Sequence, residues 1–357
     1  MKLDLNNLSP IENHTNKELV KKAYRLEPTE KTPVWLHARC QFLSNWLGIE
    51  PERYYGDARV MLHAQMAFRN KYKGIGTVSP DFGVGLLPSA FGAKITFPEG
   101  WVEPMINSLD QYEEYAESLK IPDPRVSGYL PAFYNAYFYM KTQLGDLLEP
   151  VHPSLGPFDI AGCLVGIANL LMAINEYPEA THKLLDKISD FLIDAYHCDA
   201  EMFGLDRIDT VYLGEDLPGM LSPASFKEYV LPYSKKVFDA FKSEQTINVW
   251  HCDGKLEHLI ELLPDMRVNV LYNFDPLTDL ENFTEKIGGK VCLVGNIDPV
   301  KVLRNGTVAE VKQETRRQLE LGSKYPGYVL APGGEMPEGI PEENIFAMLE
   351  TLEEFNA

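Results

Sequence analysis

Short apolar, β-branched runs recur along the 357-residue chain, and each is followed by polar or glycine-rich residues and then a helix-like stretch. Amphipathic segments with apolar residues at helical spacing, such as PASFKEYVLPYSKKVFDAFKSE, lie between most of these runs. Strands alternating with helices in this number predict an α/β fold, a closed parallel (β/α)8 TIM barrel. The eight predicted strands cover residues 32–38, 75–83, 146–154, 207–216, 246–254, 268–276, 290–299 and 327–335.

No low-complexity tract, repeat or linker divides the chain, so a single domain over residues 1–357 is expected. Residues 1–30 are expected to form an N-terminal helical extension outside the barrel. The stretch 84–145 is too long for one crossover helix, and it is expected to contribute a long loop and helices over the barrel mouth.

Composition narrows the function. Hydrophobic content of 45% and charged content of 24% are typical of a soluble globular protein, and no apolar run is long enough to span a membrane. The N-terminal segment has no apolar signal core, and five widely spaced cysteines indicate reduced thiols in a cytoplasm. A net charge of −19 argues against nucleic acid or anionic membranes as partners. No nucleotide-binding or GxSxG motif is present.

Polar residues gather at the predicted strand ends, where the loops of a TIM barrel carry its chemistry. Nearly every strand ends in a group that can titrate or bind a metal, and no such row marks the strand starts. This asymmetry predicts an enzyme with its site at the barrel mouth. The residues are His37, Arg39, Asp81, His152, Glu215, Asp216, His251, Asp253, Asp275, Asn296, Asp298 and Glu335.

The segment VWHCDGK, residues 249–255, offers a metal site. Alternate side chains of a strand point the same way, so His251 and Asp253 face one side together. Glu215 ends the preceding strand and is a natural third ligand. Three protein ligands with one open position are typical of catalytic zinc. The alternative is that His251 hydrogen-bonds a loop and Asp253 caps the next helix.

Each of the other strand-end residues could have a functional or a structural role. Asp81 in SPDFG could be a catalytic acid, a substrate anchor or a turn residue before Gly83. His37 and His152 could be functional, although a lone histidine is more often structural. Asp275 and Asp298 precede prolines, where turn chemistry suffices to explain them.

Five segments, in order over nearly the whole chain, resemble the uroporphyrinogen decarboxylase superfamily. They are TPVW at 32–35, GPFDIAG at 156–162, GEDLPGMLSPASFKEYVLPY at 214–233, VGNIDP at 294–299 and PGGEMPEGIPEENI at 332–345. The resemblance implies a (β/α)8 barrel, in agreement with the strand count. The superfamily has two main branches: the decarboxylase of haem synthesis, and methyltransferases that exchange methyl groups with a corrinoid protein.

The decarboxylase branch carries an MRQAGR segment after TPVW, and its arginines hold the acidic side chains of the substrate. Here the two arginine positions are Ala38 and Phe42, and only Arg39 is basic nearby. The late histidine of that branch falls on Gly333, although Asp81 matches its central aspartate. The chain therefore does not resemble a uroporphyrinogen decarboxylase proper. A decarboxylase of another carboxylate or tetrapyrrole, and a binding protein without catalysis, stay as alternatives.

The corrinoid methyltransferases that act on thiols bind zinc through His-x-Cys and a late cysteine. His251 matches, but the cysteine position is Asp253 and the late PGGE turn has no cysteine. Relatives that cleave methyl ethers resemble a scheme of two glutamates and a histidine, which fits Glu215 and His251. The middle glutamate falls on Val230, so Asp253 is taken as the third ligand.

The resemblance implies a methyltransferase that moves a methyl group between a small methylated or methoxylated substrate and a corrinoid protein. Zinc would be the Lewis acid in such an O-demethylation, because nitrogen and oxygen ligands keep it hard and electrophilic. Cobalamin would be carried by the partner protein, and a homodimer is compatible with the resemblance. The expected site residues are Asp81, Glu215 and His251 for catalysis; His37, Arg39, Asp81, Asn296 and Glu335 for substrate; and Glu215, His251 and Asp253 for zinc.

Overall fold

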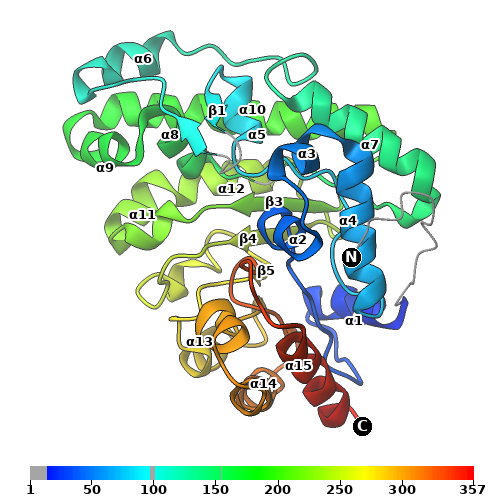
Figure 1. The fold of residues 1–357 in the computed structure, drawn as a ribbon. Coiled ribbons are helices and arrows are strands. Elements are labelled where there is room, and N and C mark those ends of the chain that lie inside the picture. Colours follow the sequence, from blue (N-terminus) through cyan, green and yellow to red (C-terminus); the bar gives the residue numbers. More distant parts are fainter. Residues whose placement is uncertain (1–13, 97–100, 154) are drawn as a thin grey trace. The chain divides into compact units, whose positions relative to one another are not determined.

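The computed structural model describes residues 14–96, 101–153 and 155–357 (Figure 1). It separates into two compact units, which are described in turn. The first comprises Met1–Asp81, His251–Pro264 and Val268–Ala357, and the second comprises Phe82–Trp250 and Asp265–Arg267. The single domain expected over 1–357 stays a prediction.

The first unit is built on three short parallel strands, all of them buried. In the first pair Val270 lies opposite Cys292, and in the second Leu293 lies opposite Tyr328. An isolated parallel bridge between Val34 and Leu330 continues the pairing beyond the last strand. The strands are β5 (Val270–Tyr272), β6 (Cys292–Val294) and β7 (Tyr328–Val329).

The helices of the first unit begin and end at clear local signals. Thr307 and Glu310 form a reciprocal capping box at the start of α14, and Asp298 caps the turn after β6. Helices α14 and α15 pack side by side near the C-terminus (Figure 1). The elements are α1 (His14–Tyr24), α2 (Cys40–Leu47), α3 (Pro51–Gly56), α4 (Ala58–Lys71), η4 (Ile260–Leu262), α13 (Leu280–Ile287), η5 (Pro299–Arg304), α14 (Val308–Gly322) and α15 (Glu342–Phe355).

The second unit contains two hydrogen-bonded strands, β3 (Thr210–Gly214) and β4 (Ile247–His251). The last residue of β4, His251, is assigned to the first unit. A parallel bridge joins Leu155 to Gly214. A separate antiparallel pair is formed by β1 (Lys94–Thr96) and β2 (Trp101–Glu103).

The 26-residue helix α10 (Pro178–Phe203) organises the second unit, and α6, α8, α9 and α12 pack against it. Its apolar stripe is fully buried and includes Leu184, Ile188 and Phe191. Gly204, in the left-handed conformation, ends it. The other elements are α5 (Leu86–Ala90), η1 (Leu109–Gln111), α6 (Tyr112–Ser118), α7 (Leu130–Leu144), η2 (Gly145–Leu147), α8 (Pro157–Val165), α9 (Ile167–Glu176), η3 (Leu217–Met220), α11 (Pro223–Tyr229) and α12 (Leu231–Ala240).

Five of the eight predicted strands are confirmed as β3 to β7. The other three, 32–38, 75–83 and 146–154, are wrong as strands: among their described residues they contribute at most the bridge at Val34. Each contains proline, which has no N–H for a strand ladder, and 75–83 also has two glycines.

Two further predictions concern the N-terminal extension, residues 1–30, and the long segment 84–145. Helix α1 lies within the expected extension 1–30, of which residues 1–13 fall outside the described part of the chain. Residues 84–145 contain α5 to α7 and the β1–β2 pair, apart from 97–100, which also fall outside it. Their place over a barrel mouth stays a prediction.

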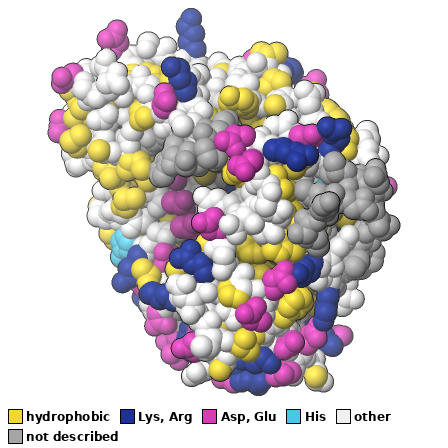
Figure 2. Space-filling view, in the orientation of Figure 1, with side chains coloured by type: hydrophobic (Ala, Val, Ile, Leu, Met, Phe, Trp, Pro, Cys, Tyr) yellow, Lys and Arg dark blue, Asp and Glu magenta, His cyan; other side chains and the backbone are white. Residues whose placement is uncertain are grey.

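Among the described residues, no helix by itself has the length and apolarity to cross a membrane; only α8 and α9 meet the test together, across a bend of 107°. Lysine and arginine side chains are interspersed with aspartate and glutamate over the face seen in Figure 2, and no extended area there carries one sign of charge.

Candidate functional site

The pair His251 and Asp253 lies in the first unit, where β4 ends. His251 Nδ1 is 2.8 Å from the carbonyl oxygen of Tyr272, and His251 Nε2 is 3.5 Å from Asp253 Oδ1. A carbonyl can only accept, so Nδ1 carries the proton and Nε2 carries the lone pair in the neutral ring. The Nε2 lone pair of His251 and the Asp253 carboxylate oxygen repel each other, because both carry negative charge density. Their close approach is favourable only when a proton or a metal cation lies between them. This is the orientation of a metal-binding histidine held by a backbone carbonyl.

The spacing of the pair suits zinc. A nitrogen and an oxygen at about 2.0 to 2.2 Å from one tetrahedral zinc ion are roughly 3.4 Å apart, and the observed separation of the two atoms is 3.5 Å. The residues present therefore fit two ligand positions of a zinc site.

The turn 332–335 has no room for side chains at its two glycines. A Cβ on Gly334 would lie 2.9 Å from Asp253 Oδ1, and φ of this residue is +90°. A Cβ on Gly333 would lie 2.8 Å from the carbonyl oxygen of Phe274. The turn therefore brings its backbone, not a thiol or imidazole, against the predicted ligand Asp253.

Asp81 is tied to Arg39. Its Oδ1 accepts from Arg39 Nε at 3.2 Å and Nη2 at 2.5 Å, and its Oδ2 accepts from Cys40 N at 3.3 Å and Tyr54 Oη at 3.2 Å. The side chain of Asp81 is only 5% exposed. With these four hydrogen bonds, two of them from a guanidinium, the Asp81 carboxylate fixes the direction of Arg39. The predicted roles of Asp81 in catalysis and substrate binding stay predictions.

A second layer holds this ion pair. Tyr54 Oη accepts from Gln65 Nε2 at 2.9 Å, and the same nitrogen donates to Ser79 O at 2.8 Å. Gln65 Oε1 in turn accepts from Ser79 N at 2.9 Å. Tyr54 is fully buried and Gln65 nearly so, which fixes the direction of the Asp81 carboxylate.

Two more predicted substrate residues share this environment. Burial, with the charges of Arg39 and His251, lowers the pKa of His37 to about 3, so its ring is neutral. His37 Nδ1 lies 2.9 Å from Asn273 Nδ2 and accepts from it, which puts the ring proton on Nε2 as a donor. Burial raises the pKa of Glu335 to about 7 against the opposing charge of Arg39. The carboxyl of Glu335 is therefore protonated in a large fraction of molecules at neutral pH.

Glu215 lies in the second unit and is fully buried. Its Oε1 accepts from Phe158 N at 2.9 Å, and its Oε2 accepts from Ser234 Oγ at 2.7 Å and Trp250 Nε1 at 3.0 Å. Burial raises the pKa of this carboxyl. These contacts give Glu215 a structural role that the sequence did not predict, while its roles as ligand and catalytic residue stay predictions.

A reciprocal contact joins the same two segments. Asp159, in the first turn of α8, accepts from the backbone N–H groups of Asp216 at 2.8 Å and Leu217 at 3.1 Å. Glu215 reaches back to the N–H of Phe158. The GPFDIAG and GEDLPG motifs thus hold each other by exchanging side chain–backbone hydrogen bonds.

The remaining predicted residues are satisfied by the protein. Asn296 is 2% exposed; its amide nitrogen donates to the carbonyls of Asp275 and Thr278, and its oxygen accepts from Gln318. Asn296 therefore has a structural role, and its predicted contact with substrate stays a prediction. Asp275 and Asp298 accept from backbone N–H groups of the following turns, as their prolines indicate.

His152, in the second unit, also has a structural environment. Its Nδ1 lies 2.9 Å from Asp199 Oδ2, and Tyr134 donates to the other oxygen at 2.8 Å.

Several residues that shape the site were not expected from the sequence. Tyr54 and Gln65 lie on α3 and α4, where no strand end marks them. Tyr272 contributes a backbone oxygen, which no side-chain pattern reveals. Asn273 had a signal, because it directly follows β5 and lies two residues before the noted Asp275.

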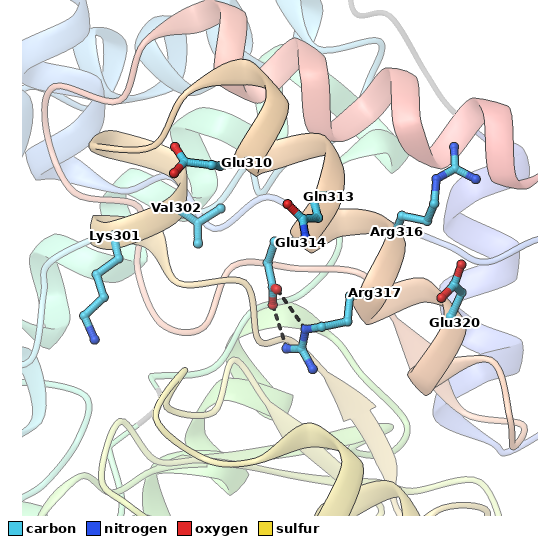
Figure 3. Close-up of a pocket in the computed structure, with 8 residues that line it drawn as sticks. All are labelled: Lys301, Val302, Glu310, Gln313, Glu314, Arg316, Arg317 and Glu320. Carbon is cyan, nitrogen blue, oxygen red and sulfur yellow. Dashed lines mark hydrogen bonds and ion pairs between the residues drawn. The ribbon is translucent and has the colours of Figure 1, made fainter.

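A groove of about 510 Å³ lies elsewhere in the first unit, along α14 (Figure 3). Its lining is Lys301, Val302, Glu310, Gln313, Glu314, Arg316, Arg317 and Glu320. Arg317 donates two hydrogen bonds to the carboxylate of Glu314, as the dashed lines in Figure 3 show. Arg316 forms an ion pair with Glu354. None of the predicted site residues lines this groove.

The fold and the motifs agree with the comparisons. The model of the uroporphyrinogen decarboxylase (URO-D) family matches residues 15–355, so the chain belongs to this family. A methyltransferase from Methanosarcina mazei has the same fold, with a TM-score of 0.78 at 22% identity over 96% of this chain and 99% of that one. The predicted superfamily and the predicted α/β TIM-barrel fold are thereby confirmed.

Curated relatives are enzymes of two kinds. The methylcobamide:CoM methyltransferase MtbA of Methanosarcina acetivorans is 26% identical over 60% of this chain, and the match spans 61% of its own length. The uroporphyrinogen decarboxylase of Carboxydothermus hydrogenoformans is 24% identical over 94% of this chain and 96% of its own. At these identities the choice between the two chemistries depends on the site.

Proposed function

We propose that this protein is a methyltransferase that moves a methyl group between a small methylated or methoxylated substrate and a corrinoid protein, with zinc as Lewis acid. The observation that carries the proposal is the pair His251 Nε2 and Asp253 Oδ1, 3.5 Å apart, with the ring held by Tyr272 O. The resemblance of the chain to corrinoid methyltransferases gives this pair its context.

The decarboxylase alternative is weaker, because the two positions where that branch has substrate-binding arginines belong to the hydrophobic core of this chain. Ala38 and Phe42 are both buried, and the ring of Phe42 packs against Trp46 and Phe68. No arginine could replace Phe42 there and still reach a ligand without emptying this aromatic cluster. Gly333 has no space for the late histidine.

His251 and Asp253 would hold the zinc, with Glu215 retained as the third predicted ligand. When bound, zinc would polarise the substrate oxygen that becomes the leaving group. The chain itself would handle the proton. Glu335, with its pKa near 7, is suited to protonate the departing oxygen, whereas His37 is neutral and suited to donate a hydrogen bond through Nε2–H. Asp81 would keep Arg39 in place.

The first experiment is the metal content of the purified protein by plasma mass spectrometry, beside a methyl-transfer assay with a corrinoid protein and a panel of methyl ethers and methylamines. About one zinc per chain is expected, lost in His251→Ala and in Asp253→Asn. His258→Ala changes an exposed histidine of the same unit and is the matched control. Glu215→Gln tests the third ligand: zinc lost with the fold intact supports ligation, and zinc retained assigns Glu215 to the structural role alone.

Absence of metal in the wild type, even after reconstitution with zinc, would overturn the proposed zinc site. Decarboxylation, or binding without catalysis, would then be the favoured function. The proposal includes a separate corrinoid protein as partner, a cytoplasmic location and a homodimer.

A further inference from the structure

Asn273 is a fully buried amide that directly follows β5 and hydrogen-bonds both to His37 and to the turn 332–335. Its φ is +46°, a conformation that asparagine adopts more readily than most residues. Its Nδ2 lies 2.9 Å from His37 Nδ1 and 3.3 Å from Gly334 O. Its Oδ1 is buried and has no partner among the described residues. An unpaired buried acceptor is costly, so the orientation of this amide needs a reason.

Gly334 decides which way the amide points. A carbonyl oxygen only accepts, so the amide atom beside it must be the nitrogen. Nδ2 carries two N–H groups, and in this orientation one donates to Gly334 O and the other to His37 Nδ1. Only Oδ1 is then unpaired. In the reverse orientation Oδ1 would face the oxygen of Gly334, and two N–H groups would lie where no partner is found. The observed orientation therefore satisfies more of the buried groups.

The fixed amide in turn fixes the ring of His37. Nδ1 faces an N–H donor, so it must carry the lone pair, because a proton on Nδ1 would be set against another N–H. The ring proton is therefore on Nε2. His37 is half-buried, and none of the described residues forms a hydrogen bond with Nε2. His37 thus presents a donor, and not an acceptor, to a ligand.

The same amide steadies the turn beside the proposed zinc ligand. Asn273 holds Gly334 by its carbonyl oxygen, and a Cβ on Gly334 would lie 2.9 Å from Asp253 Oδ1. His37 is bonded to the chain just beyond this turn, since its carbonyl oxygen accepts from Met336 N at 2.9 Å. One buried side chain therefore connects the donor ring with the turn, and this explains why the fold tolerates an unpaired Oδ1.

We propose that Asn273 is a positioning residue that locks His37 as a hydrogen-bond donor through Nε2–H, so that the ligand atom at this nitrogen is an acceptor. The use of that donor rests on the proposed function, in which the departing substrate oxygen is the acceptor. The lock itself does not, since it depends only on hydrogen bonds within the first unit. A ring with the opposite tautomer would set its Nε2 lone pair against the lone pairs of that oxygen.

The test is the tautomer of His37 in the zinc-free full-length protein, read at pH 7 from two-bond 1H–15N correlations of the labelled histidine rings. The chain has eight histidines, and the signals of His37 are those lost in His37→Gln. In the wild type the Nε2–H form is expected in tenfold excess or more. Asn273→Asp replaces the two N–H groups by a carboxylate oxygen, which accepts, so a proton should appear on Nδ1.

Asn269→Asp is the matched control, because Asn269 is exposed, directly precedes β5 and gains the same charge in the same unit. It should leave the wild-type tautomer unchanged. If Asn273→Asp lowers the thermal midpoint strongly, Asn273→Leu serves in its place. Leucine is close to asparagine in size and has no side-chain donor, so both tautomers of His37 should then appear in comparable amounts.

A proton on Nδ1 in the wild type, or comparable amounts of the two tautomers, would overturn the proposal. The wild-type tautomer in a folded Asn273 variant would do the same, since Asn273 would then have only a structural role.

The methyl-transfer assay separates the lock from its use. Asn273→Asp should lower kcat at least tenfold and change KM less than threefold. An unchanged kcat beside a reversed tautomer would overturn the use of the donor in the reaction. Methyl transfer by a wild type with mixed tautomers refutes the lock alone, whereas a locked tautomer without methyl transfer refutes the proposed function alone.

Discussion

His251 Nε2 lies 3.5 Å from Asp253 Oδ1, two residues further along the chain at the end of β4. Asp253 lies beyond the strand, and the 3.5 Å separation shows that both side chains lie on one side. The carbonyl oxygen of Tyr272 is 2.8 Å from Nδ1 at the other edge of the His251 ring. A short chain segment thus preorganises the two atoms that we propose as zinc ligands, and the surrounding turns control their geometry.

Gly334→Ala should weaken zinc binding. The new Cβ would lie 2.9 Å from Asp253 Oδ1 and would force that carboxylate to move. We expect the zinc dissociation constant to rise about tenfold or more, in the range typical for displaced metal-site neighbours. Competition with a zinc chelator measures it.

Gly339→Ala is the control for this substitution. Gly339 also has a positive φ, +78°, but its nearest atom is Arg304 Cδ at 3.8 Å. It should share the backbone strain of about 1 kcal/mol without the loss of zinc affinity. Equal zinc affinities in the two variants would mean that Asp253 is not a ligand.

Glu335→Gln should stabilise the metal-free protein at high pH. Burial raises the pKa of Glu335 from 4.5 to about 7, so the folded state holds this proton more tightly than the unfolded chain. The contribution of Glu335 to stability is therefore present at low pH and lost as the pH rises through this range. We expect a gain in unfolding free energy on the order of 2 kcal/mol at pH 8 and little change at pH 4.

Urea unfolding at both pH values measures this difference, and Glu338→Gln, an exposed neighbour, is the control. A gain of the same size at pH 4 and pH 8 would show that the effect is not due to ionisation.

Tyr54→Phe should loosen the support of Arg39. It removes the donor to Asp81 Oδ2 and the acceptor for Gln65 Nε2, in a residue with no exposed surface. The expected loss of stability is about 1 to 2 kcal/mol, because a buried carboxylate oxygen loses a donor. Urea midpoints give the value, with Tyr325→Phe at an exposed position as control. Identical midpoints for Tyr54→Phe and the wild type would contradict the network.

Glu215→Gln should destabilise the second unit. The carboxylate accepts three hydrogen bonds, and an amide would turn its NH2 group toward at least one of those donors. We expect a loss of about 1 to 3 kcal/mol in thermal or urea unfolding. Glu244→Gln, at an exposed position of the same unit, should be neutral. A Glu215→Gln variant as stable as the wild type would show that these contacts do not hold α8 to the end of β3.

The sequence by itself determined the α/β class, the family and, of the seven strands among the described residues, the five from β3 to β7. Apolar runs bounded by polar residues report burial directly, and strand-end positions are readable because the pleat alternates. The same logic placed His251 and Asp253 on one side. It failed at 32–38, 75–83 and 146–154, where hydrophobicity suggested strands but proline removed the ladder donors.

Only the tertiary structure decided what each polar residue does. In the sequence, Asn296 and Asp298 look like Asp81 and Glu335, because all four follow predicted strands. In the structure Asn296 and Asp298 hydrogen-bond mainly to backbone groups. Asp81 accepts from Arg39, and the charge of Arg39 opposes the rise in the pKa of Glu335. The partners that decide this, Gln65, Tyr272 O and Gly334, are distant in the chain or belong to the backbone. A hydrogen-bond partner or a missing Cβ has no local sequence signature, because it depends on which segments the fold brings into contact.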